Sequence, residues 1–103
     1  MTSGEARKLA LALPEAVEQD HHGRPSFRVG GKIFATLWDE EHMNVMLDEG
    51  GILMAVQEHP DACSEVMWGK RLAAVRVRLP KARPAMLRRM LEEAWELRAH
   101  RRR

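Results

Sequence analysis

A pair of glycines, Gly30-Gly31, separates two runs of β-type residues, 27–29 and 32–38. Alternating apolar side chains are typical of a strand with one buried face, and a Gly-Gly pair accepts the positive φ angles of a two-residue turn. This stretch therefore predicts a β-hairpin. A phosphate-binding loop is not expected, because Lys32 is followed by Ile33 and a strand pattern, not by Ser or Thr and a helix.

The remaining sequence predicts a small α+β domain. Thr2 and Glu5 form a capping-box pattern ahead of a first helix that ends at Pro14, and the polar stretch 15–24 is expected to be a loop. Further strands are expected at 43–47, 64–68 and 72–79, a second helix between Asp48 and Pro60, and a third after Pro84. The predicted order is α-β-β-β-α-β-β-α, with the helices packed on one face of an antiparallel sheet.

The 103 residues are enough for one domain, 1–103, whose last residues, 100–103, are a basic tail. Charge is distributed unevenly along it. Residues 1–69 contain 5 Lys/Arg and 12 Asp/Glu, whereas residues 70–103 contain 12 Lys/Arg and 3 Asp/Glu. This asymmetry indicates either an anionic partner for the C-terminal third or mutual neutralisation of the two parts.

Arg76 and Arg78 alternate with apolar residues on the last predicted strand, so their side chains should share its exposed face. They could contact phosphates, or form a solvated face partly paired with acidic residues of the last helix, Glu92, Glu93 and Glu96. Other basic residues surround that strand or lie on the first hairpin, which would form a second phosphate-contacting element. They are Lys70, Arg71, Lys81, Arg83, Arg28 and Lys32.

Trp38 and Trp68 could stack on bases, although core packing is the simpler expectation for both side chains. The last helix has a wide apolar arc that could instead contact another protein. No recognition helix is apparent, so any binding of duplex DNA is expected to be non-specific.

The sequence favours a non-enzymatic protein without metal or cofactor. His21-His22 follow Asp20, and such a pair acts as a general base only beside a nucleophile or pocket; Ser26 lies nearby, but solvated loop histidines are the simpler expectation. The single cysteine, Cys63, cannot complete a zinc site. The chain shows no secretory signal and no apolar run of about 20 residues, so a cytoplasmic monomer or weak dimer away from membranes is expected.

The block "GRPSFRVGGKIFATL", with "LALPEAVE" before it and "MWGKRLAAVRVRL" after it, resembles the MmcQ/YjbR family of small bacterial proteins. The resemblance covers about residues 5–99. It implies a CyaY-like fold with a double-wing arrangement, and DNA binding by analogy with that arrangement. The alternative function is a module that binds a protein or small ligand in a pocket between the sheet and the second helix. Phe27, Phe34 and Trp68 would line that pocket.

Overall fold

The computed structural model describes residues 1–99 of the chain, so the predicted basic tail at 100–103 lies outside the described residues. Three α-helices, six strands and one short 3-10 helix make up this part. In chain order they are α1 (Ser3–Leu11), β1 (Val17–His21), β2 (Arg24–Val29), β3 (Lys32–Asp39), β4 (His42–Val45), α2 (Glu49–Glu58), β5 (Cys63–Trp68), β6 (Arg71–Arg78), η1 (Leu79–Lys81) and α3 (Pro84–Ala99).

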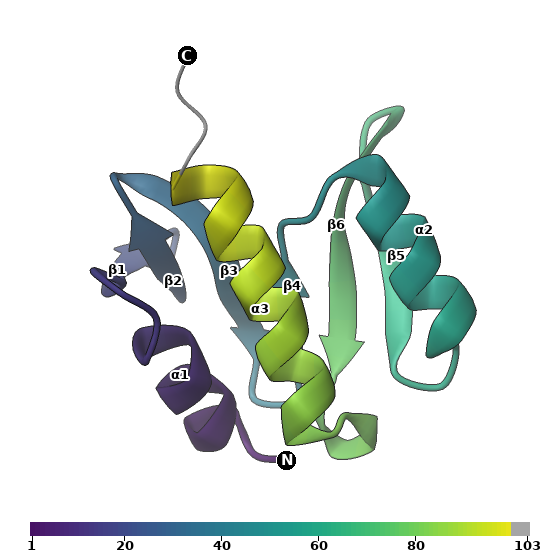
Figure 1. The fold of residues 1–103 in the computed structure, drawn as a ribbon, viewed down its shortest axis with the longest axis horizontal. Helices are drawn as coiled ribbons and strands as arrows, with labels where there is room; N and C mark the ends of the chain where they lie inside the picture. Colours follow the sequence, from purple (N-terminus) through teal and green to yellow (C-terminus); the bar gives the residue numbers. More distant parts are fainter. Residues whose placement is uncertain (100–103) are drawn as a thin grey trace.

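The strands form one antiparallel sheet in the order β1-β2-β3-β4-β6-β5. All three helices lie on the same side of it, with α1 and α3 over β2, β3 and β4 and α2 over β5 and β6 (Figure 1). The predicted α+β class and the packing of helices on one face are therefore confirmed. None of the helices in residues 1–99 is both long and apolar enough to cross a membrane.

Local signals in the sequence account for several element boundaries. Gly30 and Gly31 both have positive φ, 59° and 78°, and they form the predicted turn between β2 and β3. Thr2 accepts a hydrogen bond from the backbone N–H of Glu5, whose carboxylate accepts one from the backbone N–H of Thr2. The predicted capping box is therefore confirmed, and Asp48 caps α2 in the expected way by accepting from the Gly51 N–H.

The expectation of a loop over residues 15–24 was wrong. Val17–His21 forms β1, an edge strand that pairs with β2 through a turn at His22 and Gly23, both of which have positive φ. Four of its five residues are exposed, and only one edge of the strand is paired. A strand in this position buries almost no apolar surface, so it lacks the alternating pattern by which strands are recognised.

The core lies between the sheet and the helices. Two rows of cross-strand neighbours supply its sheet side: one joins Phe27, Ala35, Val45 and Val75, and the other joins Leu37, Met43, Val77 and Cys63. Buried side chains of α3, including Leu87 and Leu91, pack against this face. Because successive side chains of a strand point to opposite faces, the residues between these rows face away from the helices.

Candidate functional site

A row of polar residues crosses the whole sheet on the face that carries no helix. Each member is the direct cross-strand neighbour of the next, and every strand contributes one residue. In spatial order the row is Gln19, Ser26, Thr36, Asn44, Arg76 and Ser64. It lies between the two apolar rows in register, so one face of these strands forms a core while the other presents hydrogen-bonding groups.

The centre of this row is buried although no helix covers it. Ser26, Thr36 and Asn44 are 0%, 7% and 3% exposed, because long side chains from neighbouring positions close over them. The Ser26 hydroxyl donates to the Gln19 carbonyl at 2.8 Å and accepts from Arg28 Nε at 3.1 Å. Three members of the row, Thr36, Asn44 and Arg76, form the floor of a groove whose lining also includes other arginine side chains and two tryptophans.

The groove encloses about 730 Å³. Its lining has a one-sided charge: it includes six Lys or Arg residues and no Asp or Glu among the described residues. The six are Arg24, Arg28, Lys32, Arg71, Arg76 and Arg98. Six cations that face a common hollow without a carboxylate raise its positive potential, because low-dielectric walls concentrate the field.

Three of these arginines are fixed through the same atom. Nε of Arg24 donates to the Trp38 carbonyl, Nε of Arg28 to Ser26, and Nε of Arg76 to Asn44, at 2.9, 3.1 and 2.9 Å. None of the three forms an ion pair with an acidic side chain within residues 1–99. A guanidinium held by Nε keeps its two terminal nitrogens for a second acceptor, the fork that binds phosphate or carboxylate oxygens.

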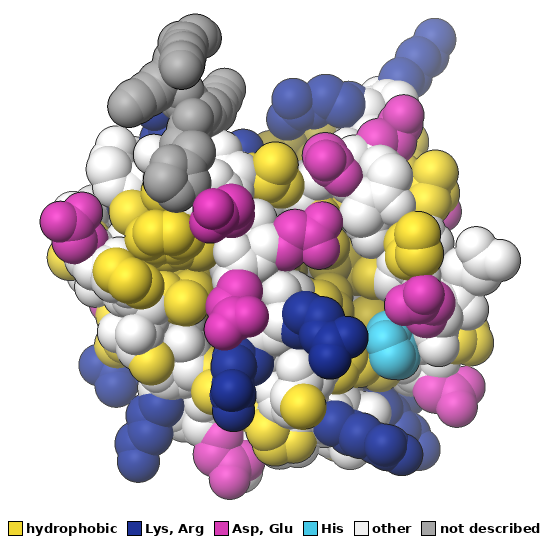
Figure 2. Space-filling view, viewed as in Figure 1, with side chains coloured by type: hydrophobic (Ala, Val, Ile, Leu, Met, Phe, Trp, Pro, Cys, Tyr) yellow, Lys and Arg dark blue, Asp and Glu magenta, His cyan; other side chains and the backbone are white. Residues whose placement is uncertain are grey.

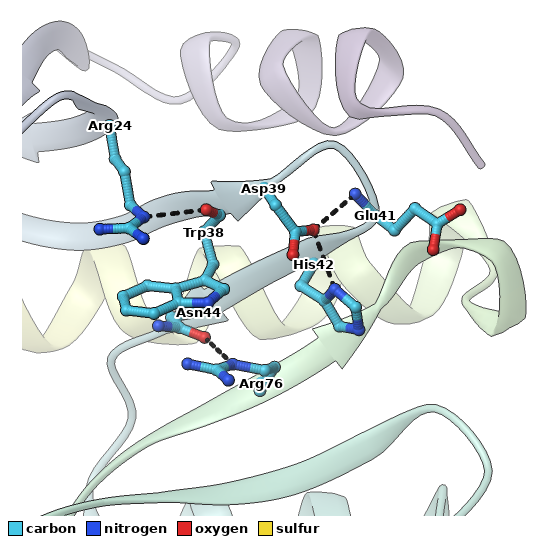
Figure 3. A network of polar contacts seen from close by, with 7 residues as sticks. All are labelled: Arg24, Trp38, Asp39, Glu41, His42, Asn44 and Arg76. Carbon is cyan, nitrogen blue, oxygen red and sulfur yellow. Dashed lines mark hydrogen bonds and ion pairs between the residues drawn. The ribbon is translucent and has the colours of Figure 1, made fainter.

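Trp38 organises two of these guanidinium groups. Cζ of Arg24 lies 3.7 Å from the centre of its indole ring and Cζ of Arg76 lies 4.6 Å from it. Figure 3 shows the indole between the two guanidinium groups, one from β2 and one from β6. Such cation–π contacts hold like charges near each other without a carboxylate between them.

The second tryptophan of the groove, Trp68, is less enclosed. It lies at the end of β5 and is 54% exposed, with Cζ of Arg71 5.7 Å from its ring centre. Trp38 is 39% exposed. The simpler expectation, that both tryptophans pack in the core, was therefore wrong, and both line the groove instead.

Two titratable groups outside the groove lining have perturbed pKa values. The hydrogen bond with His42 Nδ1, at 2.9 Å, and a second from the Glu41 backbone N–H lower the pKa of the Asp39 carboxyl (Figure 3). Burial beneath α2 and the core raises the pKa of the Cys63 thiol to about 11. A thiol with so high a pKa is protonated at neutral pH and is therefore a poor nucleophile.

The structure brings only part of the predicted basic set together. Arg28, Lys32, Arg71 and Arg76 line the groove, whereas Lys70 and Arg78 are exposed outside its lining. Lys81 and Arg83 lie beyond the far end of β6. This strand is about 23 Å long at roughly 3.3 Å per residue, and Arg71 is at its start. Arg76 contacts Asn44 and Trp38 instead of the glutamates of α3, which lie on the other side of the sheet.

The three residues of the predicted ligand pocket do not meet in one hollow. Phe27 and Phe34 are fully buried in the core, whereas Trp68 lines the groove on the opposite face of the sheet. A hollow of about 600 Å³ does lie beside α2, but it is formed between α2 and α3. Its lining includes three carboxylates, those of Asp48, Glu58 and Glu93.

The charges of the two sides differ accordingly. On the side that carries the helices, acidic and basic side chains lie next to one another (Figure 2). The groove lining carries cations and no carboxylate among the described residues, and its members that were not anticipated include Arg24, Thr36, Asn44 and Arg98. A proline follows Arg24 in the sequence, and Thr36 and Asn44 look like isolated polar residues in apolar strands, so only cross-strand register reveals their common position.

Comparisons with curated proteins and with solved structures find no match. The model of one protein family, YjbR, matches residues 11–97, a stretch that contains all six strands, α2 and most of α3. The match covers the region in which the sequence alone resembles that family, including the β2–β3 hairpin and the arginine-bearing β6. The chain belongs to the YjbR family.

Proposed function

We propose that this chain is a non-enzymatic nucleic-acid-binding protein that contacts backbone phosphates in the groove of its open sheet face. One observation carries the proposal: six Lys or Arg side chains line the groove without a single Asp or Glu among the described residues. Like charges in one hollow repel one another and reduce stability unless an anion enters between them. A polyanion supplies that charge.

The geometry of the arginines supports phosphate as the anionic group. Arg24, Arg28 and Arg76 are oriented by their Nε hydrogen bonds before any ligand arrives, so less side-chain entropy is lost on binding. Their terminal nitrogens can form the paired hydrogen bonds that a phosphate accepts.

The spread of the cations favours a chain of phosphates over one compact anion. Arg24 and Arg28 come from β2, and Arg71 and Arg76 come from β6, which lies three strand spacings away. At about 4.8 Å per spacing, the backbones that carry these pairs are roughly 14 Å apart, although the guanidinium groups of Arg24 and Arg76 converge on the Trp38 ring. Cations supplied by β2, β3, β6 and α3 suit several linked phosphates better than one phosphate group.

A small ligand with an anionic group is the second candidate. The groove volume, about 730 Å³, lies within the range of small-molecule sites, roughly 300–1,000 Å³. Its apolar and aromatic members, among them Met46, Val66 and Trp68, could cover an organic body. For this candidate the ligand site is the groove, not the predicted pocket between the sheet and α2.

A salt titration tests the proposal. The probe is a labelled DNA that contains a 20-base-pair duplex and a 12-nucleotide single-stranded extension, measured by fluorescence anisotropy. We expect binding at about micromolar affinity in 50 mM salt and a linear fall of log affinity with log salt. Arg28→Gln/Arg76→Gln should lower the slope by about 1.4 to 1.8, because each lost phosphate contact removes roughly 0.7–0.9.

A matched variant removes the same charge from the opposite side of the molecule. Arg88 and Arg89 are exposed on α3, so Arg88→Gln/Arg89→Gln should change affinity by no more than about twofold. Equal losses in the two variants would show that net charge alone matters and would contradict a role for the groove. Absence of binding at 50 mM salt would contradict nucleic-acid binding itself.

A further inference from the structure

We infer that the groove receives an unpaired, single-stranded segment of nucleic acid, with one base against the Thr36–Asn44 floor and another stacked on Trp68. This inference rests on the proposed function and specifies the form of the ligand. Phosphate contacts alone do not distinguish a single strand from a duplex. The polar groups of the floor and the exposed indole of Trp68 do distinguish a single strand from a duplex.

Two polar groups of the floor have no partner in the described part of the chain. Thr36 Oγ1 forms no hydrogen bond there, and Asn44 uses Oδ1 to accept from Arg76 while its Nδ2 donates to nothing. Every fully buried side-chain N or O atom of the described residues does have a partner. Both groups must therefore be open to the groove, although their residues are only 7% and 3% exposed.

Water can reach an amide N–H and a hydroxyl that open into a hollow, and a ligand that displaces this water keeps its affinity only if it pairs with both groups. Thr36 and Asn44 are direct cross-strand neighbours, so their side chains are about 5 Å apart at Cβ. An amide N–H and a hydroxyl at that spacing match the acceptors along the edge of a nucleobase. Phosphates, in contrast, would meet the charged side chains above the floor.

The two tryptophans have different roles. The indole of Trp38 lies between the guanidinium groups of Arg24 and Arg76, so it positions those cations and is not itself free to stack on a base (Figure 3). Trp68 is 54% exposed, and its nearest cation, Arg71, is 5.7 Å from the ring centre. Its ring is therefore the stacking platform, beside the apolar side chains of Val66 and Met67.

A duplex does not suit this arrangement. Its base edges are reached by protein elements that protrude into its grooves, such as a helix or a two-stranded ribbon. Here the polar groups lie at the bottom of a concave surface, which only an unstacked base can enter. The hairpin turns at Gly30-Gly31 and Gly69-Lys70 carry one side chain between them, that of Lys70, so they offer little to read base edges in a duplex groove.

The test compares a 12-nucleotide single-stranded DNA with a blunt hairpin duplex that has the same number of phosphates. We expect the single strand to bind the wild-type chain at least tenfold more tightly at 100 mM salt. Trp68→Ala should weaken single-strand binding by tenfold or more, and Trp68→Phe, which keeps a ring, should restore most of it. Thr36→Val, which keeps the shape and removes the hydroxyl, should weaken it by threefold or more.

Lys70→Gln is the matched change at a protruding turn and should weaken single-strand binding by no more than about twofold. Melting temperatures of all variants are measured to establish that each is folded. Duplex binding as tight as single-strand binding, with Lys70→Gln more damaging than Trp68→Ala, would overturn the inference while the proposed function stands. Failure of both DNAs to bind would overturn the proposed function as well.

Discussion

The two faces of the sheet are built from the same strands but follow opposite rules. On the helix-covered face, cross-strand neighbours form two apolar rows that pack against α1, α2 and α3. On the open face, the intervening row is polar across all six strands, and cations surround it. The face that stabilises the fold and the face proposed to bind a ligand are thus the two sides of one sheet.

This separation has a consequence for how the chain tolerates change. Burial of apolar area on one face supplies most of the free energy of folding, so the other face can carry unfavourable groups. Those groups include six Lys or Arg residues in a lining without a carboxylate among the described residues, and two polar groups, Thr36 Oγ1 and Asn44 Nδ2, that open into the groove. Sites of function are often less stable locally than the scaffold that carries them.

The largest expected contrast is between the stability losses caused by substitutions at two adjacent residues of β2 whose side chains face opposite sides of the sheet. Phe27 is fully buried in the core, so Phe27→Ala should lower the free energy of unfolding by about 3–5 kcal/mol. Ser26 is equally buried on the open face, but Ser26→Ala loses only its hydrogen bonds and should cost about 1 kcal/mol. Urea unfolding measures both values.

Phe27→Leu provides an intermediate if Phe27→Ala is too unstable to purify, because the total stability of a small domain is only about 5–15 kcal/mol. DNA binding should respond in the reverse order: Ser26→Ala releases Arg28 and weakens binding, whereas folded Phe27→Leu binds as the wild type does. Equal stability losses at the two positions would contradict the division between the faces.

The second contrast concerns pH and lies on the covered face. Cys63 belongs to an apolar row, and burial raises the pKa of its thiol from 9.0 to about 11. Between these values the unfolded chain loses the thiol proton and the folded chain keeps it, so stability falls as pH rises. The total loss is about 2–3 kcal/mol, present in full above pH 11 and absent below pH 9.

Chemical unfolding of the wild type and Cys63→Ala at intervals from pH 8 to pH 11 isolates this contribution, because other groups titrate alike in both proteins. The difference between the two unfolding curves should shrink or reverse by about that amount. A constant difference over the whole range would show that the thiol ionises freely in the folded protein.

The smallest expected effect has the opposite sign and lies on the open face. Lys32 is exposed and lines the groove without an acidic neighbour in its lining, so Lys32→Gln reduces repulsion among the cations. We expect the free energy of unfolding to rise by a few tenths of a kcal/mol at low salt. The gain should vanish near 1 M salt, where the screening length is about 3 Å. Arg88→Gln on α3, measured in parallel, should show no such gain.

Much of the covered face could be predicted from the sequence. The turn at Gly30-Gly31, the capping box at Thr2 and the alternation of Val75 and Val77 with arginines each depend on neighbours in the chain. Local patterns of this kind are visible in a single sequence. They led directly to the β2–β3 hairpin, α1 and β6, and to the side of β6 that faces the core.

The open face could be predicted only in part. Arg28, Lys32, Arg71 and Arg76 were expected on exposed strand faces or turns, but their convergence on one groove depends on strand order and register. Bulges at Phe27/Arg28 and Leu37/Asp39 shift that register, and no local pattern fixes them. β1 was missed for a related reason: at a sheet edge, its polar residues show no alternation.

The strand order also bears on when the groove first exists. Every neighbouring pair in the sheet is formed by consecutive strands, except β4 with β6, which are separated in sequence by α2 and β5. Hairpins close quickly, whereas a pairing across so long a connection is slow because its loop entropy must be lost first. Asn44 and Arg76 meet in that pairing, and the same pairing brings Arg76 within reach of Trp38 on β3. Ligand binding in the groove would therefore report the last step of chain assembly, and a chain released before that step would have the β1–β4 meander and the β5–β6 hairpin but no groove.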